Sequence, residues 1–289
     1  MSFEIITDSS ANLSRSMVQE LGIHVMPLSL FFGEEELHSF SEDTDFDYKA
    51  FYDRLRNKEH AKTSLINVER FVAQYETYLK EGKDVLNIVM SSGISGTFQS
   101  AKIAADTLRE QYPNRQIIVI DSLSASVGEG LLVYYAAKMR EEGKSIEETA
   151  DWIYKNRLNM VHQFTVDDLF FLKRGGRLSG GVAIIGTILQ IKPVLHVDNE
   201  GHLIAQEKVN GRKKSINRMV EIFKENAIDP ENQVLAICHG DSQKDAEYLE
   251  KKVREAVNVK DIIVNPLDPV LGAHAGPDTV ALFYLGKQR

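Results

Sequence analysis

A polar loop near residue 95 carries the side chains best suited to bind an anion. It reads Ser91-Ser92-Gly93-Ile94-Ser95-Gly96-Thr97 and lies between an apolar run and an amphipathic segment. Free amides at a helix start favour an anion, and a glycine such as Gly96 lets a ligand approach the backbone closely. With the hydroxyls of Ser95 and Thr97, the loop suits a carboxylate or a phosphate. The alternative is that these hydroxyls only cap the helix.

The same loop also has a catalytic interpretation. Its sequence nearly matches the G-x-S-x-G nucleophile elbow, with Ser95 in the nucleophile position. A downstream histidine and several aspartates permit the order Ser–Asp–His. However, Thr97 replaces the last glycine, and a β-branched residue fits poorly in a crowded elbow. A serine hydrolase that uses Ser95 and His274 is therefore the second hypothesis.

Two polar residues elsewhere in the chain are further candidates. Thr63 precedes a predicted helix with Asn67 at its N-cap. The simpler interpretation of Thr63 is that it belongs to the turn before that helix. His274 lies in a stretch with a glycine on either side, which suggests a backbone close to another group. The alternative for His274 is a structural role. The other histidines share no metal-like spacing and Cys238 is the only cysteine, so we predict no metal site.

A basic loop follows near residue 175. Lys173, Arg174 and Arg177 surround a Gly-Gly turn, an arrangement that suits a phosphate or an acidic partner. It is not a Walker loop, because the G-x-x-x-x-G-K-[ST] pattern is absent. The alternative is an ordinary solvated loop. A protein that binds a phosphate ligand through this loop is the third hypothesis.

The elements that must position these residues alternate between strand and helix in the first 160 residues. This order predicts βαβ units and a parallel sheet, with polar loops at the carboxyl ends of its strands. The predicted strands are 3–7, 24–32, 85–90 and 116–121; the predicted helices are 13–21, 47–55, 67–79, 95–110, 127–140 and 145–158; and the polar loops are 8–12, 91–97 and 121–126.

The second half predicts a mixed α+β domain. A hairpin turn at 198–201 separates two apolar runs, and an apolar stretch at 182–191 predicts a helix that either fills the core or lines a tunnel. We expect two domains, 1–160 and 161–289. The remaining predicted elements are helices at 168–174, 213–225 and 244–256 and strands at 194–197, 203–209, 233–238, 261–265 and 279–285.

Composition narrows the class of protein. The chain has 289 residues and a net charge of −8, which argues against broad nucleic-acid binding. Its start lacks the features of a signal peptide, and no apolar run approaches the ~20 residues of a membrane span. We therefore expect a cytoplasmic protein without stable membrane insertion.

Taken in order, these segments resemble the DegV family nearly from end to end. The most specific piece is Ser95-Gly96-Thr97-Phe98-Gln99-Ser100-Ala101, which is similar to the family's S-G-T-[YF]-Q-S-A segment. Each piece is short, but the ordered set is specific. The other matching pieces are Ile6–Leu13, Thr63-Ser64, Val119–Ser122, Leu172–Ser179, Ile191–Pro193, His239–Asp241 and Gly272–Pro277.

The resemblance implies a two-domain α/β protein with an N-terminal α/β/α parallel-sheet domain, a C-terminal α+β mixed-sheet domain and a ligand between them. That ligand would be a long-chain fatty acid such as palmitate, and no cofactor is implied. Thr63, Ser95 and His274 match the family's carboxylate-binding positions, and Gly96 would add a backbone amide.

The resemblance also implies a non-catalytic role. The chain would present its fatty acid to the catalytic subunit of a fatty acid kinase, which phosphorylates the carboxylate for phospholipid metabolism. Lys173, Arg174 and Arg177 are the candidate contacts for phosphate or kinase. Departures from the family pattern at 65–67, at 210–211 and at Asp278 affect acyl-chain preference and partner docking, but leave the three carboxylate positions intact.

Overall fold

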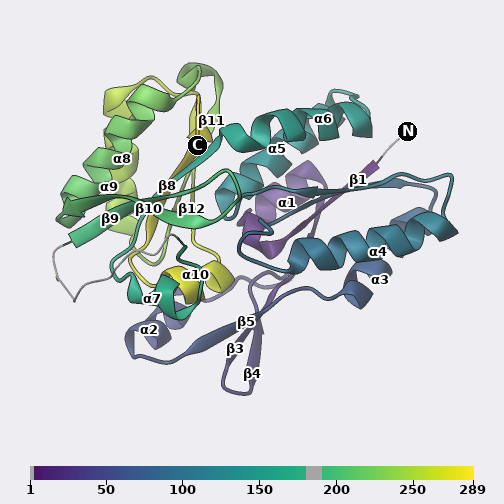
Figure 1. Ribbon diagram of the computed structural model, residues 1–289, viewed down its shortest axis with the longest axis horizontal. Helices are drawn as coiled ribbons and strands as arrows, with labels where there is room; N and C mark the ends of the chain where they lie inside the picture. Colours follow the sequence, from purple (N-terminus) through teal and green to yellow (C-terminus); the bar gives the residue numbers. More distant parts are fainter. Residues whose placement is uncertain (1–2, 180–190) are drawn as a thin grey trace.

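The computed structural model describes residues 3–179 and 191–289, which form two lobes built on separate sheets (Figure 1). The N-terminal sheet is parallel throughout, as predicted. Ile5 packs on one of its faces and Ile6 on the other, because successive strand residues point to opposite sides. The strands in spatial order are β2 (Ile23–Met26), β1 (Phe3–Asp8), β6 (Asp84–Val89) and β7 (Ile117–Asp121).

Helices cover both faces of this sheet, which confirms the predicted α/β/α arrangement. Two helices pack on the face that contains Ile6 and three on the face that contains Ile5. The first group is α3 (Val68–Lys80) and α4 (Thr97–Gln111), and the second is α1 (Arg15–Leu21), α5 (Val127–Glu141) and α6 (Ile146–Asn156).

The C-terminal sheet is mixed, as predicted. Only β11 and β12 pair in parallel, and α8 (Arg212–Asn226) and α9 (Gln243–Ala256) cover one face. Its first strand in chain order, β8, begins at Met160. The strands in spatial order are β10 (Leu203–Asn210), β9 (Ile191–Val197), β8 (Met160–Thr165), β13 (Val280–Leu285), β11 (Val234–His239) and β12 (Asp261–Pro266).

The other face of the C-terminal sheet packs against the N-terminal lobe. Cys238, Ala281 and Phe283 from this sheet share a hydrophobic core with Val127 and Leu131 of α5. The lobes are therefore joined by buried apolar surface and not only by the connecting chain.

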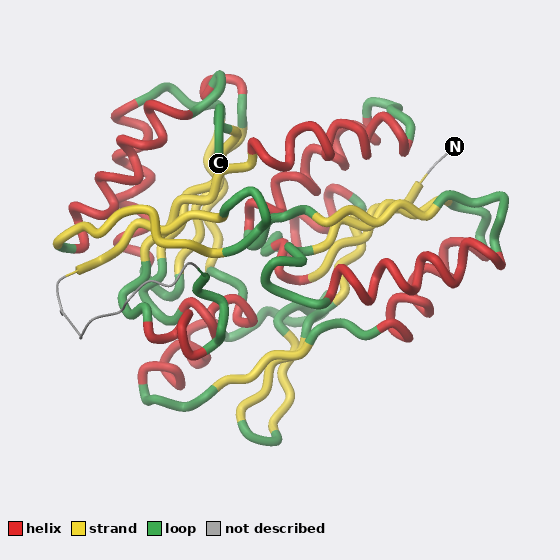
Figure 2. The backbone as a smooth tube through the Cα atoms, in the orientation of Figure 1, coloured by secondary structure: helices red, strands yellow, loops and turns green. Residues whose placement is uncertain are grey.

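A small antiparallel sheet was not predicted. It consists of β4 (Glu35–His38), β3 (Ser29–Phe32) and β5 (Ala61–Ser64), and it projects below both lobes (Figure 2). The predicted single strand at 24–32 is wrong: it divides into β2 and β3, which belong to different sheets. Pro27 lies at the division, where a residue without an N–H interrupts a ladder of hydrogen bonds.

Two other local predictions also need correction. Thr63 lies in β5 rather than in a turn, and His274 lies in the last turn of α10 (Pro269–Ala275) rather than in a loop. Of the predicted apolar helix at 182–191, residues 182–190 lie outside the described residues, and Ile191 begins β9. The remaining helices are α2 (Tyr48–Arg56), α7 (Phe170–Arg174) and the short 3-10 turns η1 (Ser9–Ala11), η2 (Arg157–Asn159) and η3 (Pro230–Asn232).

Within residues 3–179 and 191–289, no helix combines the length and the apolar character that crossing a bilayer requires.

Candidate functional site

A cavity of about 230 Å³ lies between the two lobes and the small sheet. Its wall is mainly aliphatic and aromatic, and it draws on strands and helices of all three parts of the fold. Apolar lining of this kind is typical of small-molecule sites, which add a few polar groups to orient the ligand. Representative lining residues are Leu28, Phe164, Leu203, Leu267, Val270 and Phe283.

Thr63 and His274 form the polar contact that best defines this cavity. The Oγ1 atom of Thr63 lies 2.8 Å from Nε2 of His274, across 211 residues of sequence. β5 positions Thr63 through its pairing with Leu30 of β3. The helix α10 positions His274, and its start is fixed by Asp268, whose carboxylate accepts a hydrogen bond from the Val270 amide at 2.8 Å.

Ser95 and Gly96 line the same cavity from the loop between β6 and α4. The Oγ atoms of Ser95 and Thr97 are 2.8 Å apart, and Ser95 Oγ also accepts a bond from the Thr97 amide at 3.2 Å. A side chain at position 96 would place its Cβ only 3.1 Å from Leu65, so a glycine keeps this wall open. The structure thus brings Thr63, Ser95, Gly96 and His274 to one cavity.

Burial keeps the His274 imidazole neutral. Desolvation, reinforced by the positive charges of Arg177 and Arg174, lowers the pKa of His274 to about 4. Its Nδ1 edge packs closely on Gly175, where an added Cβ would come within 2.4 Å. A neutral imidazole next to a threonine hydroxyl offers hydrogen bonds rather than a fixed charge.

This geometry does not favour a hydrolase. The imidazole of His274 contacts Thr63 and not Ser95, whose hydroxyl pairs with Thr97. Among the described residues, no carboxylate is hydrogen-bonded to His274 to orient it as a base. A nucleophile–base–acid chain needs both of these contacts.

The basic loop divides between the cavity and the surface. Arg177 lines the cavity, and its Nε donates to the Ile94 carbonyl at 3.3 Å. Lys173 and Arg174 are exposed, and an Arg174 guanidinium nitrogen lies 2.8 Å from Nδ1 of His60. The sequence analysis predicted one shared role for the three cations. Their spacing in a loop does not show which way each side chain points.

Five further polar residues on the cavity wall were not predicted as site residues: Ser64, Ser126, His162, Cys238 and Thr279. Ser126 and Cys238 both line the cavity, and their Oγ and Sγ atoms are 3.3 Å apart. The position of Ser126 at the end of the predicted polar loop 121–126 was the available signal. Cys238 had none, because a cysteine in an apolar strand usually packs as a small hydrophobic residue.

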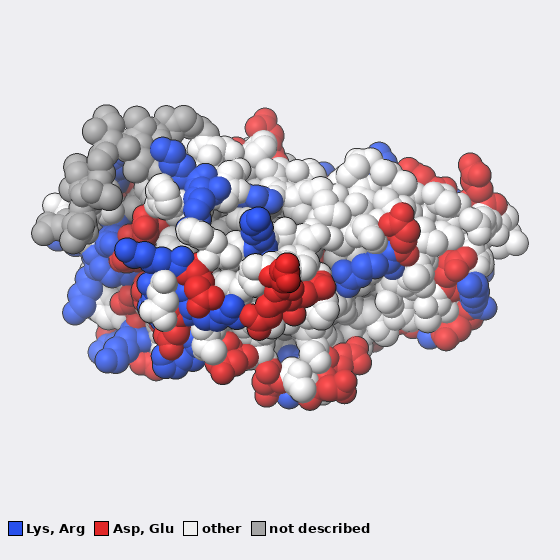
Figure 3. Space-filling view, turned by 90° about the horizontal axis from the view of Figure 1, so that it is seen from below, with Lys and Arg blue, Asp and Glu red and all other residues white. Residues whose placement is uncertain are grey.

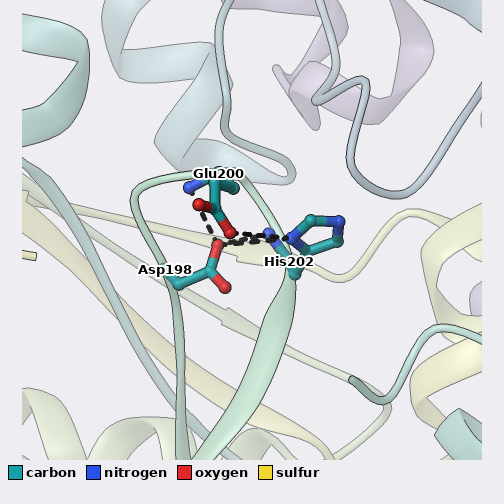
Figure 4. Close-up of side chains that lie close together, drawn as sticks. All are labelled: Asp198, Glu200 and His202. Atoms are coloured by element: carbon teal, nitrogen blue, oxygen red, sulfur yellow. Dashed lines mark hydrogen bonds and ion pairs between the residues drawn. The ribbon is translucent and has the colours of Figure 1, made fainter. Parts of the chain in front are cut away.

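A group of potential metal ligands lies at the turn between β9 and β10 (Figure 4). It consists of Asp198, Glu200 and His202, whose ligand atoms lie within 4.8 Å of one another. However, Asp198 Oδ1 already accepts hydrogen bonds from the amides of Glu200 and His202, both at 2.9 Å. The Asp198 carboxylate therefore shapes the hairpin turn, and we assign no metal to this group.

The fold and the cavity together define a two-lobed α/β protein with a mostly apolar cavity between its lobes. More particularly, the chain belongs to the DegV family: the family model described as "Uncharacterised protein, DegV family" matches residues 2–287. A DegV domain-containing protein from Clostridium perfringens is 42% identical over 287 residues, which are 99% of this chain and 98% of that protein.

Solved structures of relatives agree with this assignment. The DegV fatty acid binding protein from Bacillus subtilis has 31% identity and a TM-score of 0.84, and the match covers 99% of this chain and 100% of that one. A DegV family protein from Thermus thermophilus, whose structure is described as showing fatty acid binding, has 29% identity and a TM-score of 0.88, with 98% and 99% covered.

Proposed function

We propose that this chain binds one long-chain fatty acid, with the acyl tail in the cavity and the carboxylate held by Thr63, Ser95, His274 and the amide of Gly96. The observation that carries the proposal is the 2.8 Å contact between Thr63 and His274 at the wall of an apolar cavity. Relatives with about 30% identity that are described as fatty acid binding proteins support it.

The tail and the head of the ligand have different roles in this proposal. Burying a tail of about 15 methylenes contributes at most roughly 12 kcal/mol, at about 0.8 kcal/mol for each methylene. Ordering the tail and closing the cavity reduce that figure. The head contributes placement, because a carboxylate without hydrogen bonds in an apolar cavity is very costly. Two hydroxyls, one imidazole N–H and one amide provide the donors that its lone pairs require.

Extraction with organic solvent followed by mass spectrometry tests the proposal. The protein purified from bacteria should release close to one fatty acid for each chain, and delipidated protein should bind palmitate again. A Thr63→Val/His274→Ala double variant should retain much less lipid. Protein that carries no lipid and does not bind palmitate would contradict the proposal.

We further propose that the bound fatty acid is presented to a separate kinase in the cytoplasm. The kinase would transfer the γ-phosphoryl group of ATP to a carboxylate oxygen, which yields an acyl phosphate and ADP. Lys173 and Arg174 are exposed next to the cavity residue Arg177. On the face shown in Figure 3, Lys and Arg side chains on this half of the molecule lie among Asp and Glu side chains, so the proposal depends on the exposed pair Lys173 and Arg174 rather than on a broad basic surface.

Reconstitution with a fatty acid kinase catalytic subunit tests the presentation step. Acyl phosphate can be trapped with hydroxylamine and counted as hydroxamate. A Lys173→Ala/Arg174→Ala variant should bind palmitate as the parent does, but should support slower phosphorylation. The matched control is Lys102→Ala, which removes an exposed charge from α4 on the N-terminal lobe. Equal rates for all three proteins would contradict the assignment of these cations.

A fluorophosphonate probe separates lipid binding from the hydrolase hypothesis. Because no base among residues 3–179 and 191–289 contacts Ser95, we expect no covalent label on this residue in the folded protein. Labelling of Ser95 that is lost in a His274→Ala variant would support a hydrolase.

A further inference from the structure

One part of the cavity wall carries a pair of polar side chains, a serine hydroxyl and a cysteine thiol, that the proposed carboxylate site does not use. Ser126 and Cys238 face each other there, and both are buried. The 3.3 Å contact with Cys238 Sγ is the one hydrogen bond of the Ser126 hydroxyl among the described residues. Because burial raises the pKa of Cys238 to about 12, the partner is a neutral thiol.

The backbone of Ser126 is unusual for its position. It is the N-cap residue of α5, yet its φ of 57° and ψ of −154° prevent the ordinary cap, and its side chain makes no capping bond. Ser145 shows the ordinary arrangement at α6, with φ −73°, ψ 164° and a hydroxyl that accepts from the Glu148 amide. A non-glycine residue in such a region is strained, and the cap is lost as well. The strained backbone leaves the Ser126 hydroxyl at the cavity wall.

The thiol does not satisfy the Ser126 hydroxyl. A serine hydroxyl has one donor and two acceptor sites, whereas a thiol is only a weak donor and a weak acceptor. If Ser126 donates to Cys238, its lone pairs lack a donor. If Cys238 donates to Ser126, the serine proton lacks an acceptor. A ligand hydroxyl can act as donor or acceptor, so it completes either arrangement, whereas a plain methylene completes neither.

We propose that Ser126 and Cys238 form a polar subsite for a hydroxyl group carried on the acyl chain, so that hydroxy fatty acids belong to the ligand class of this protein. This inference rests on the proposed function, because it needs an acyl chain in the cavity. The residues of the subsite are separate from Thr63, Ser95 and His274, so its loss is measurable while the carboxylate site stays intact.

A binding panel of stearate and stearates with a single hydroxyl at successive carbons tests the subsite. Each acid displaces a fluorescent fatty acid from delipidated protein. We expect at least one positional isomer to bind the parent within about threefold of stearate. In Ser126→Gly, which removes the hydroxyl and relieves the positive φ, that isomer should bind about tenfold more weakly relative to stearate, as loss of one hydrogen bond predicts.

Two further variants make the result unambiguous. Ser126→Ala should show the same loss of affinity for the favoured isomer. Ser92 is an exposed serine on another loop, so Ser92→Ala should keep the parent's ratio of affinities for that isomer and for stearate. The subsite is overturned if the parent binds every isomer over a hundredfold more weakly than stearate, or if Ser126→Gly leaves the ratio unchanged. If neither stearate nor palmitate binds, the proposed function fails as well.

Discussion

The hydroxyl of Ser91 donates a hydrogen bond to the backbone carbonyl of Gly201 at 2.9 Å, and this bond joins the two lobes. Ser91 begins the loop that carries Ser95, whereas Gly201 belongs to the β9–β10 turn. Val197 and Leu203, on either side of that turn, line the cavity. The hairpin of the C-terminal lobe therefore packs on the loop that contributes to the proposed carboxylate site.

Gly93→Ala should loosen the contact between the 91–97 loop and the β9–β10 turn. An added Cβ would lie 2.8 Å from the carbonyl oxygens of Glu200 and Gly201, and neither backbone can yield without moving the hairpin. Overpacking of this kind costs typically 1–3 kcal/mol, or roughly 2–10 °C in melting temperature for a chain of this size. Calorimetry measures the stability, and stopped-flow displacement should show faster release of fatty acid. With Ser92→Ala as the control, unchanged release from Gly93→Ala would show that the hairpin does not limit ligand exchange.

Arg289→Ala should destabilise the protein. The Arg289 guanidinium donates to the carbonyls of Met160, Arg157 and Asp198 and to Ser124 Oγ, at distances of 2.9–3.2 Å. Its removal leaves partly buried acceptors without donors, so we expect a loss of about 1–3 kcal/mol in the free energy of unfolding. Urea titration measures this loss. Arg289→Lys should recover only part of it, because an ammonium cannot reproduce the planar fork. Equal stability of Arg289→Ala and the parent would contradict this role.

The sequence predicted the large sheets better than the small one. Runs such as 85–90, bounded by glycines and polar loops, predict strands because their β-branched residues are buried on both faces of a parallel sheet. The three-stranded sheet was missed because its strands have four residues each, and β3 pairs with β5 from about thirty positions away. Local patterns do not show such pairing.

The helix around His274 was missed for a different reason. Gly272 and Gly276 suggested a loop, but Gly272 lies within α10, where a glycine leaves room for Tyr52: a Cβ there would lie 2.4 Å from the tyrosine hydroxyl. Tertiary packing thus overrides the low helix propensity of glycine. The contact between His274 and Thr63 likewise depends on the packing of α10 against β5. The family resemblance predicted that the two would share a site, whereas the residue types alone did not.

His274→Ala should weaken the binding of the carboxylate head group and leave the binding of the acyl tail unchanged. Hydrogen bonds to charged groups contribute about 1.5–3 kcal/mol, so the affinity for palmitate should fall roughly 10- to 100-fold. Methyl palmitate has the same tail but no negative charge, and its weaker binding should change much less. Displacement titrations of both ligands from the parent and the variant measure the difference. An equal loss for the acid and the ester would indicate a change in the cavity rather than loss of a carboxylate contact.

The pKa of His274 also predicts how stability changes with pH. This pKa is about 4, against an ordinary value of 6.5, so the unfolded chain binds a proton between these values and the folded chain does not. Stability is therefore lost as the pH falls below about 6.5, and the loss levels off near pH 4. Between pH 7 and pH 5 the expected contribution is about 2 kcal/mol. His274→Gln lacks this titration, so delipidated parent protein should lose about 2 kcal/mol more than the variant over this interval. Parallel losses in urea titrations at the two pH values would show that His274 is not buried as a neutral group.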